Sequence, residues 1–237
     1  IDMTYMFKGC SALTSLDISL FNTENVINMK GMFLNCEKLE KINMKNINTE
    51  YVTDMSEMFS YCYALDNLDL SSFNTINVIK MNKMFYSCKN LKNLDISKFN
   101  TDQVEDMSYL FYGCESLTSL TLKFNTKNVK SMQMMFNRCY SLEHIDVSQF
   151  DTSEVTTIEY MFSSCSSLKS INLDNFNTEK VTKMSALFQG CTSITSLFLP
   201  NFKTRNVDNM QMMFLDMTSL ETLDISTFHT SSVVFFR

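Results

Sequence analysis

Apolar and polar positions repeat along this chain with a period of 26 residues. Valines keep this spacing from Val26 to Val233. A fixed period of about 20 to 50 residues is typical of solenoids, in which each unit buries its apolar face against its neighbours. Numbered from its valine, a unit reads V-x-x-M-x-x-M-F-x-x-C-x-x-L-x-x-L-D-L-S-x-F-N-T-x-x. The cysteines lie six times 26 residues apart and once 25 apart, at Cys10, Cys36, Cys62, Cys88, Cys114, Cys139, Cys165 and Cys191.

The pattern predicts two elements in each unit. Apolar residues at positions 1, 4, 7, 8 and 11 follow helical spacing and predict a short helix with one buried face. The threonine at position 24 is expected to cap its N-terminus. After the cysteine, L-x-x-L-x-L ends in the alternation of a short strand, with position 18 pointing outward. We therefore expect an α/β solenoid of about nine units, with a parallel sheet on one side and helices on the other.

The repeat also explains the unusual composition. The chain has 20 Phe and 19 Met, and most of them occupy the apolar positions 4, 7, 8 and 22 of the units. These residues are expected to form the core. The repeat covers the chain from end to end, so we predict one domain over residues 1–237, belonging to a longer protein.

Several classes of function are disfavoured. Only 4 glycines leave little material for a loop that wraps a phosphate. A net charge of -6 disfavours nucleic acid as a partner. No apolar run approaches the ~20 residues of a membrane span, so no direct membrane insertion is expected from this segment. The sequence suggests no cofactor.

The cysteines are predicted to be free and buried. All of them occupy the same position of the unit, so neighbouring side chains point the same way at the unit spacing, whereas a disulfide needs Cβ atoms at ~3.8 Å. The chain has 2 His and no C-x-x-C, so no metal site is predicted. An open, regular sheet also offers no pocket to activate a nucleophile, and no catalytic residue is predicted.

The repeat resembles the BspA-like leucine-rich repeat of bacterial surface proteins, the DUF285-type repeat. The resemblance implies a right-handed leucine-rich-repeat solenoid, an extracellular or lipid-anchored location and, for many members, adhesion. It implies no catalytic residues. One unit that carries the motif contains Met81, Met84, Phe85, Cys88, Leu91, Leu94, Asp95, Ile96, Ser97, Phe99, Asn100 and Thr101.

Two surfaces are candidates for binding a partner. The outward face of the expected helices gathers aromatic and Met side chains, which protein interfaces favour. The alternative is the outward face of the sheet, where a parallel sheet supplies the usual recognition surface of leucine-rich repeats. The first candidate consists of Tyr86, Tyr109, Tyr112, Met134 and Tyr160, and the second of Asp69, Asp95, His144 and Asp146.

The repeat favours a non-enzymatic interaction module. The resemblance implies that it lies on the cell surface and binds a protein or another macromolecule of a neighbouring cell or the matrix. A structural spacer and an intracellular protein-binding scaffold are the alternatives. The terminal units are expected to expose apolar residues that inner units bury. End-to-end self-association or fraying is therefore expected, because solenoids normally need capping repeats.

Overall fold

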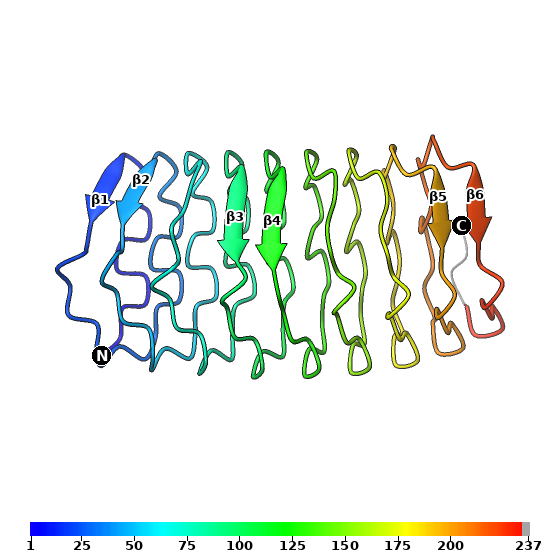
Figure 1. Cartoon of the computed structure of the whole chain (residues 1–237), viewed down its shortest axis with the longest axis horizontal. Coiled ribbons are helices and arrows are strands. Elements are labelled where there is room, and N and C mark those ends of the chain that lie inside the picture. The colour runs from blue at the N-terminus through cyan, green and yellow to red at the C-terminus, as the bar shows by residue number, and fades with distance from the viewer. Residues whose placement is uncertain (234–237) are drawn as a thin grey trace.

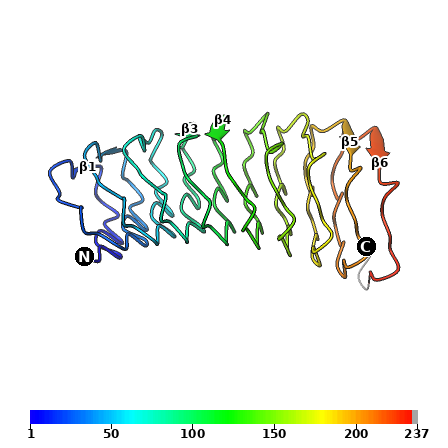
Figure 2. The same cartoon turned by 60° about the horizontal axis from the view of Figure 1, so that its bottom comes forward.

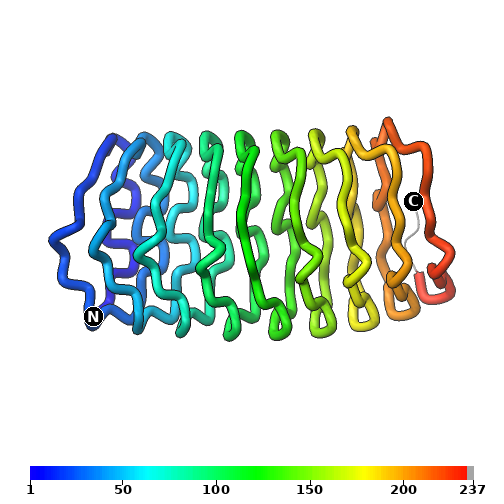
Figure 3. Tube along the Cα trace, viewed as in Figure 1, coloured from blue at the N-terminus to red at the C-terminus, as the bar shows by residue number. Residues whose placement is uncertain are grey.

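The computed structural model describes residues 1–233 as one row of stacked units (Figures 1 and 3). Six short strands lie along one side of the row, and Figure 2 shows the remaining chain of each unit on the other sides. The strands pair in parallel as β1 with β2, β3 with β4, and β5 with β6. Their bounds are β1 Ser15–Asp17, β2 Lys41–Asn43, β3 Asn93–Ile96, β4 Ser119–Leu122, β5 Ser196–Phe198 and β6 Thr222–Asp224.

The register of the strands follows the repeat. Leu16 lies beside Ile42, and Leu94 lies beside Leu120. A second parallel ladder of single bridges joins position 3 of each unit to position 3 of the next, from Asp2 to Asn209. Each unit is therefore one coil of the solenoid, and equivalent residues form columns along the molecule.

The predicted helix layer is wrong, because residues 1–233 contain no helix. The segment from position 4 to position 11 is a series of turns whose amides alternate between two kinds of acceptor. Met32 N–H donates to Met29 O at 3.2 Å within the unit, whereas Phe33 N–H donates to Met58 O at 2.9 Å in the next unit. A helix would direct every such amide to its own unit. Here half of the hydrogen bonds join units, which ties each coil to its neighbour.

The backbone conformation explains why no helix forms. Positions 6 and 10 have positive φ in every unit, as in Tyr109 with φ 61° and Gly113 with φ 69°. A left-handed residue ends helical hydrogen bonding. The segment instead forms consecutive turns, each closed by a hydrogen bond from an amide to the carbonyl of the third preceding residue. These turns place positions 4, 7, 8 and 11 on one side, as a helix would. The predicted buried positions are therefore confirmed, although the element is different.

The prediction that the threonine at position 24 caps a helix is also wrong. Thr152 is 1% exposed. Its Oγ1 donates to Asn177 O at 3.0 Å and accepts from Asn177 N–H at 2.8 Å. Both contacts are with the following unit. The threonine column is therefore a ladder between units, placed where the chain turns from the strand side to the turn side.

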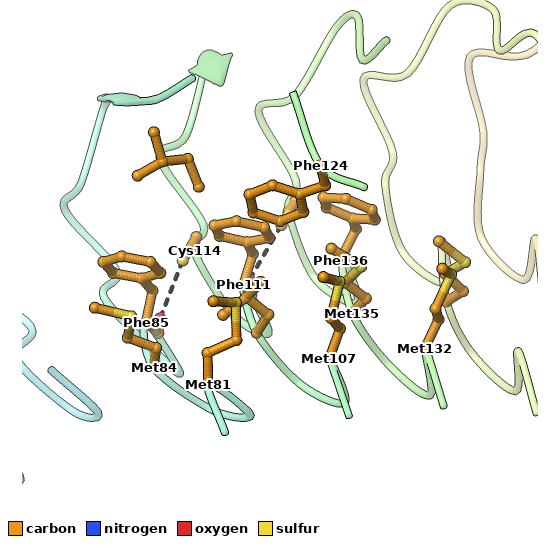
Figure 4. Close-up of a cluster of buried hydrophobic side chains, with 14 of the residues drawn as sticks. Met81, Met84, Phe85, Met107, Phe111, Cys114, Phe124, Met132, Met135 and Phe136 are labelled. Atoms are coloured by element: carbon orange, nitrogen blue, oxygen red, sulfur yellow. Dashed lines mark hydrogen bonds between the residues drawn. The ribbon is translucent and has the colours of Figure 1, made fainter. Parts of the chain in front are cut away.

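Phenylalanine rings stack through the core. The position 8 rings lie parallel, with Phe85 and Phe111 centroids 5.7 Å apart at 2° and Phe111 and Phe136 at 5.5 Å. Figure 4 shows these rings beside the buried methionines. It also shows Cys114, whose thiol donates to Phe85 O at 3.2 Å. The Phe and Met residues counted in the repeat therefore form the core, as predicted.

One unit is shorter than the others and lacks a turn. Elsewhere the position 22 amide closes a turn on position 19, as Phe99 N–H does on Ile96 O at 3.0 Å and Phe150 N–H on Val147 O at 3.0 Å. In the 25-residue unit the chain runs from β4 through Lys123 directly to the buried Phe124. The missing residue removes the turn and leaves the core intact.

Candidate functional site

Five tyrosines form a cluster on the turn side of three consecutive units. The tyrosine cluster consists of Tyr61, Tyr63, Tyr86, Tyr109 and Tyr112, all half-buried. Tyr86 and Tyr112 stack with centroids 4.5 Å apart at 8°. Tyr61 lies 5.0 Å from Tyr86, and Tyr109 lies 5.9 Å from Tyr112. Tyr63 meets Tyr61 edge to face at 6.0 Å. The rings form one continuous aromatic surface.

The turns explain how these rings meet. Tyr86 and Tyr112 both occupy position 9, so the stacking of units places one ring over the other. Tyr61 occupies position 10, where φ is 61°, and Tyr63 occupies position 12. The sequence analysis did not include these two, because it took its candidates only from positions 6 and 9 of the outward face. Their proximity in sequence to the aromatic positions was the only signal.

The remaining two predicted residues lie outside this cluster. Met134 and Tyr160 occupy position 6 in the next two units, with φ of 54° and 55°, and both are half-buried. Tyr160 makes no aromatic contact within residues 1–233. The structure thus brings Tyr86, Tyr109 and Tyr112 together, whereas Met134 and Tyr160 continue only the column of Tyr109.

Three cations lie over the rings of the cluster. Lys83 Nζ is 5.2 Å from the Tyr109 centroid, Lys89 Nζ is 5.5 Å from that of Tyr63, and Arg138 Cζ is 5.7 Å from that of Tyr112. Such distances allow cation–π attraction.

Burial holds the central phenol of the cluster protonated. Desolvation raises the pKa of Tyr86 far above its usual value, and the neighbouring Tyr61 and Tyr112 raise it further. The cluster combines apolar ring area, phenol hydroxyls and positive charge.

The sheet-side candidates lie beside two shallow hollows. Asp69 and Asp95 line a hollow of about 480 Å³, together with Thr121 and other residues of three units. Both carboxylates already accept hydrogen bonds from backbone amides. Asp69 Oδ1 accepts from Ser71 N–H at 2.9 Å, and Asp95 Oδ1 accepts from Ser97 N–H at 3.0 Å. These side chains therefore shape the turns of their own units.

The second hollow, of about 680 Å³, lies where the 25-residue unit lacks its turn. Thr121, Lys123 and Asp146 are among its lining residues. Asp146 accepts Ser148 N–H at 3.0 Å and Ser148 Oγ at 2.6 Å. His144 is exposed beside it and does not line the hollow. Asp69, Asp95 and Asp146 thus line two adjoining hollows that share Thr121.

Hydrogen bonding lowers the pKa of each of these carboxyl groups. For Asp69, Asp95 and Asp146 the largest cause is the hydroxyl of the serine two residues later, followed by its amide. The carboxylates are ionised and exposed at neutral pH. Among residues 1–233, no group of three or more His, Cys, Asp and Glu is arranged to hold a metal ion. No helix long and apolar enough to cross a bilayer occurs in the same range.

Seven of the eight cysteines are buried, and all are free. Desolvation raises the pKa of Cys36 to about 11 and that of Cys114 to about 12. Cys10 is exposed, which corrects the prediction that every thiol is buried. The buried thiols act as small core residues that also donate to the preceding coil.

Comparison with known families gives one match along the chain. The model of a family described as "Mycoplasma protein of unknown function, DUF285" matches residues 1–96, 87–173 and 168–237. No curated protein sequence matches the chain significantly.

Solved structures similar to this chain are bacterial leucine-rich repeat proteins. One from Bacteroides ovatus is 20% identical over 93% of this chain and 77% of its own length, with a TM-score of 0.40. One from Eubacterium ventriosum is 19% identical over 82% of this chain and 63% of its own, with a TM-score of 0.45. A leucine rich cell surface protein from Faecalibacterium prausnitzii is 14% identical over 90% and 79%, with a TM-score of 0.37.

Proposed function

The chain belongs to the DUF285 family, and on that premise we propose that it is a non-enzymatic module that binds a protein of another cell or of the matrix through the tyrosine cluster. The family match agrees with the resemblance of its repeat to BspA-like surface proteins. The same proposal places the chain on the cell surface, held there by segments outside residues 1–237, and assigns adhesion as its role.

One observation carries this proposal. The sheet side presents small polar groups and carboxylates that already bond to their own turns. The turn side instead gathers five rings within contact distance of one another. Tyrosine and arginine are enriched among the residues that dominate the energy of protein interfaces, and truncating such a residue costs about 1 kcal/mol or more. The aromatic surface therefore supplies what the sheet lacks.

Beads coated with the protein test this role. We expect coated beads to be retained on cultured cells or on matrix protein more strongly than blank beads. The double change Tyr109→Ala and Tyr112→Ala removes two rings and should lower affinity at least thirtyfold, from about 1 kcal/mol or more per ring. The thermal midpoint should change little, since both rings are half-buried on the surface.

The matched control is Asp69→Ala with Asp95→Ala, which alters the sheet side alone. Retention that survives the tyrosine changes but disappears in the control would make the sheet the binding surface. Equal retention of coated and blank beads on every cell and matrix tested would favour the spacer or the intracellular scaffold. End-to-end association belongs to the same proposal, and sedimentation at increasing protein concentration tests it.

A further inference from the structure

The cations of the tyrosine cluster lie over its aromatic rings. Seven lysines within residues 1–233 pair with a carboxylate of a neighbouring unit, as Lys130 does with Glu105 at 2.7 Å and Lys180 with Glu154 at 2.6 Å. Such pairs neutralise the surface along the column. In the cluster, Lys89 keeps a partner in Glu115 at 3.2 Å.

Lys83 and Arg138 have no carboxylate within 4.0 Å in the part of the chain that the structure describes. Each lies over a tyrosine ring instead. A ring attracts a cation without neutralising it. This small area is therefore positive on a chain whose net charge is -6.

We propose that the tyrosine cluster binds an acidic segment of the partner protein, with partner carboxylates paired to Lys83 and Arg138 and apolar partner groups on the rings between them. This inference rests on the proposed function and names its partner. The positive area also explains selectivity, because an acidic segment is repelled by the rest of the molecule.

The spacing of the two cations suggests the form of the segment. Lys83 and Arg138 belong to units two apart, which separates them by about 10 Å along the solenoid axis at the ~4.8 Å spacing of parallel strands. A segment in the polyproline II conformation has three residues per turn and rises about 3.1 Å per residue, so side chains three residues apart lie about 9 Å apart on the same face. Such a segment with acidic residues three apart, running along the solenoid axis, matches this axial spacing.

A synthetic peptide tests the inference directly. The probe is a fluorescein-labelled peptide of repeated Glu-Leu-Ser, which places glutamates three residues apart. Binding is followed by anisotropy and by tyrosine emission, which is unobscured because the chain has 9 Tyr and no Trp. We expect saturable binding that weakens at least tenfold in the double variant Lys83→Gln with Arg138→Gln.

Two controls make the result specific. The double variant Lys180→Gln with Lys203→Gln removes the same charge elsewhere and should bind as the unmodified protein does. A peptide with lysine in place of glutamate should not bind. Equal loss in both double variants would overturn the inference, because it would show that the loss follows the change in net charge and not the removal of these two cations.

Other outcomes separate this inference from the proposed function. Binding of heparin without binding of the acidic peptide would overturn the inference in favour of a sulfated polysaccharide. No binding of the peptide, while bead retention persists and depends on Tyr109 and Tyr112, would overturn the acidic partner alone. Absence of both peptide binding and bead retention would overturn the inference and the proposed function together.

Discussion

Glycine is rare in this chain, and all four glycines occupy the two columns with a left-handed backbone. Gly9, Gly113 and Gly190 are at position 10, and Gly31 is at position 6, each with positive φ. A side chain in this conformation costs roughly 1 to 2 kcal/mol. Fourteen other residues adopt the same conformation with a side chain. The hydrogen bonds between units therefore compensate a recurrent backbone cost.

Two alanine substitutions separate backbone strain from crowding. Gly113 and Gly190 have nearly equal φ, but an added Cβ would lie 3.0 Å from Ser87 Oγ at Gly113 and 3.6 Å from Ser164 Cα at Gly190. Gly190→Ala should destabilise the fold by about 1 kcal/mol from strain alone. Gly113→Ala should cost more. Urea unfolding measures both, and equal midpoints would show that Ser87 moves aside freely.

The thiols should divide into one reactive and seven protected groups. Cys10 is exposed, and the remaining seven are buried. Because burial raises the pKa of Cys36 and Cys114 well above pH 8, the thiolate that attacks a thiol reagent is scarce at that pH. We expect one fast reaction in the native protein and eight in denaturant. Bridged cysteine pairs seen by mass spectrometry would contradict this reading.

At the scale of the element, the threonine ladder joins each coil to the next. Thr152→Val keeps the side-chain shape but removes the donor to Asn177 O and the acceptor of its amide. An unsatisfied buried group costs about 1 to 3 kcal/mol, so the midpoint of thermal unfolding should fall. Thr152→Ser keeps the hydroxyl and should cost only the methyl group, about 1 kcal/mol. Equal losses in both variants would mean that the hydroxyl is dispensable.

The sequence predicts this element only in part, for a physical reason. Burial of positions 1, 4, 7, 8 and 11 follows equally from a helix and from consecutive turns closed at the third residue, so apolar spacing does not distinguish them. The glycines at positions 6 and 10 favour turns over a helix, because glycine destabilises the interior of a helix. The strand alternation was read correctly at Leu94 and Ile96, both buried.

The candidate site follows the same logic. Tyr86 and Tyr112 were named as candidates, and because they share a column the stacking of units places one ring over the other. Tyr61 and Tyr63 were not named, because they lie at positions 10 and 12 of a single unit and form no column of aromatic residues. The hollow beside Asp146 arises from one missing residue in the preceding unit. The sequence shows the deletion, but it does not show whether the chain closes the gap or leaves a hollow.

For the whole molecule, aligned aspartates predict how stability depends on pH. Hydrogen bonds from serine lower the pKa of Asp69, Asp95, Asp146 and Asp224 in the fold. A lowered folded pKa gives stability that is present above the unfolded pKa, about 3.9, and is lost as pH falls through the folded value. The urea midpoint should be level from pH 7 to about 5 and decrease below about 4.

Asparagine variants supply the control for this pH dependence. Asn43 and Asn172 already occupy the same column, and their Oδ1 atoms accept the amide two residues later. Asp69→Asn with Asp95→Asn should therefore keep the turns and make the acid dependence shallower. Parallel curves for the variant and the unmodified protein would show that other groups govern acid unfolding.

Hydrogen bonds between units join residues 23 to 29 positions apart, as in the bond from Cys114 to Phe85 and that from Thr152 to Asn177. Within residues 1–233 these bonds join neighbouring coils only, so duplication or loss of one whole coil in the gene would recreate the same contacts at the new junction. The number of coils can then change during evolution without other changes in sequence. Each added or lost coil would change, by one coil, the distance between the tyrosine cluster and any anchor of the protein.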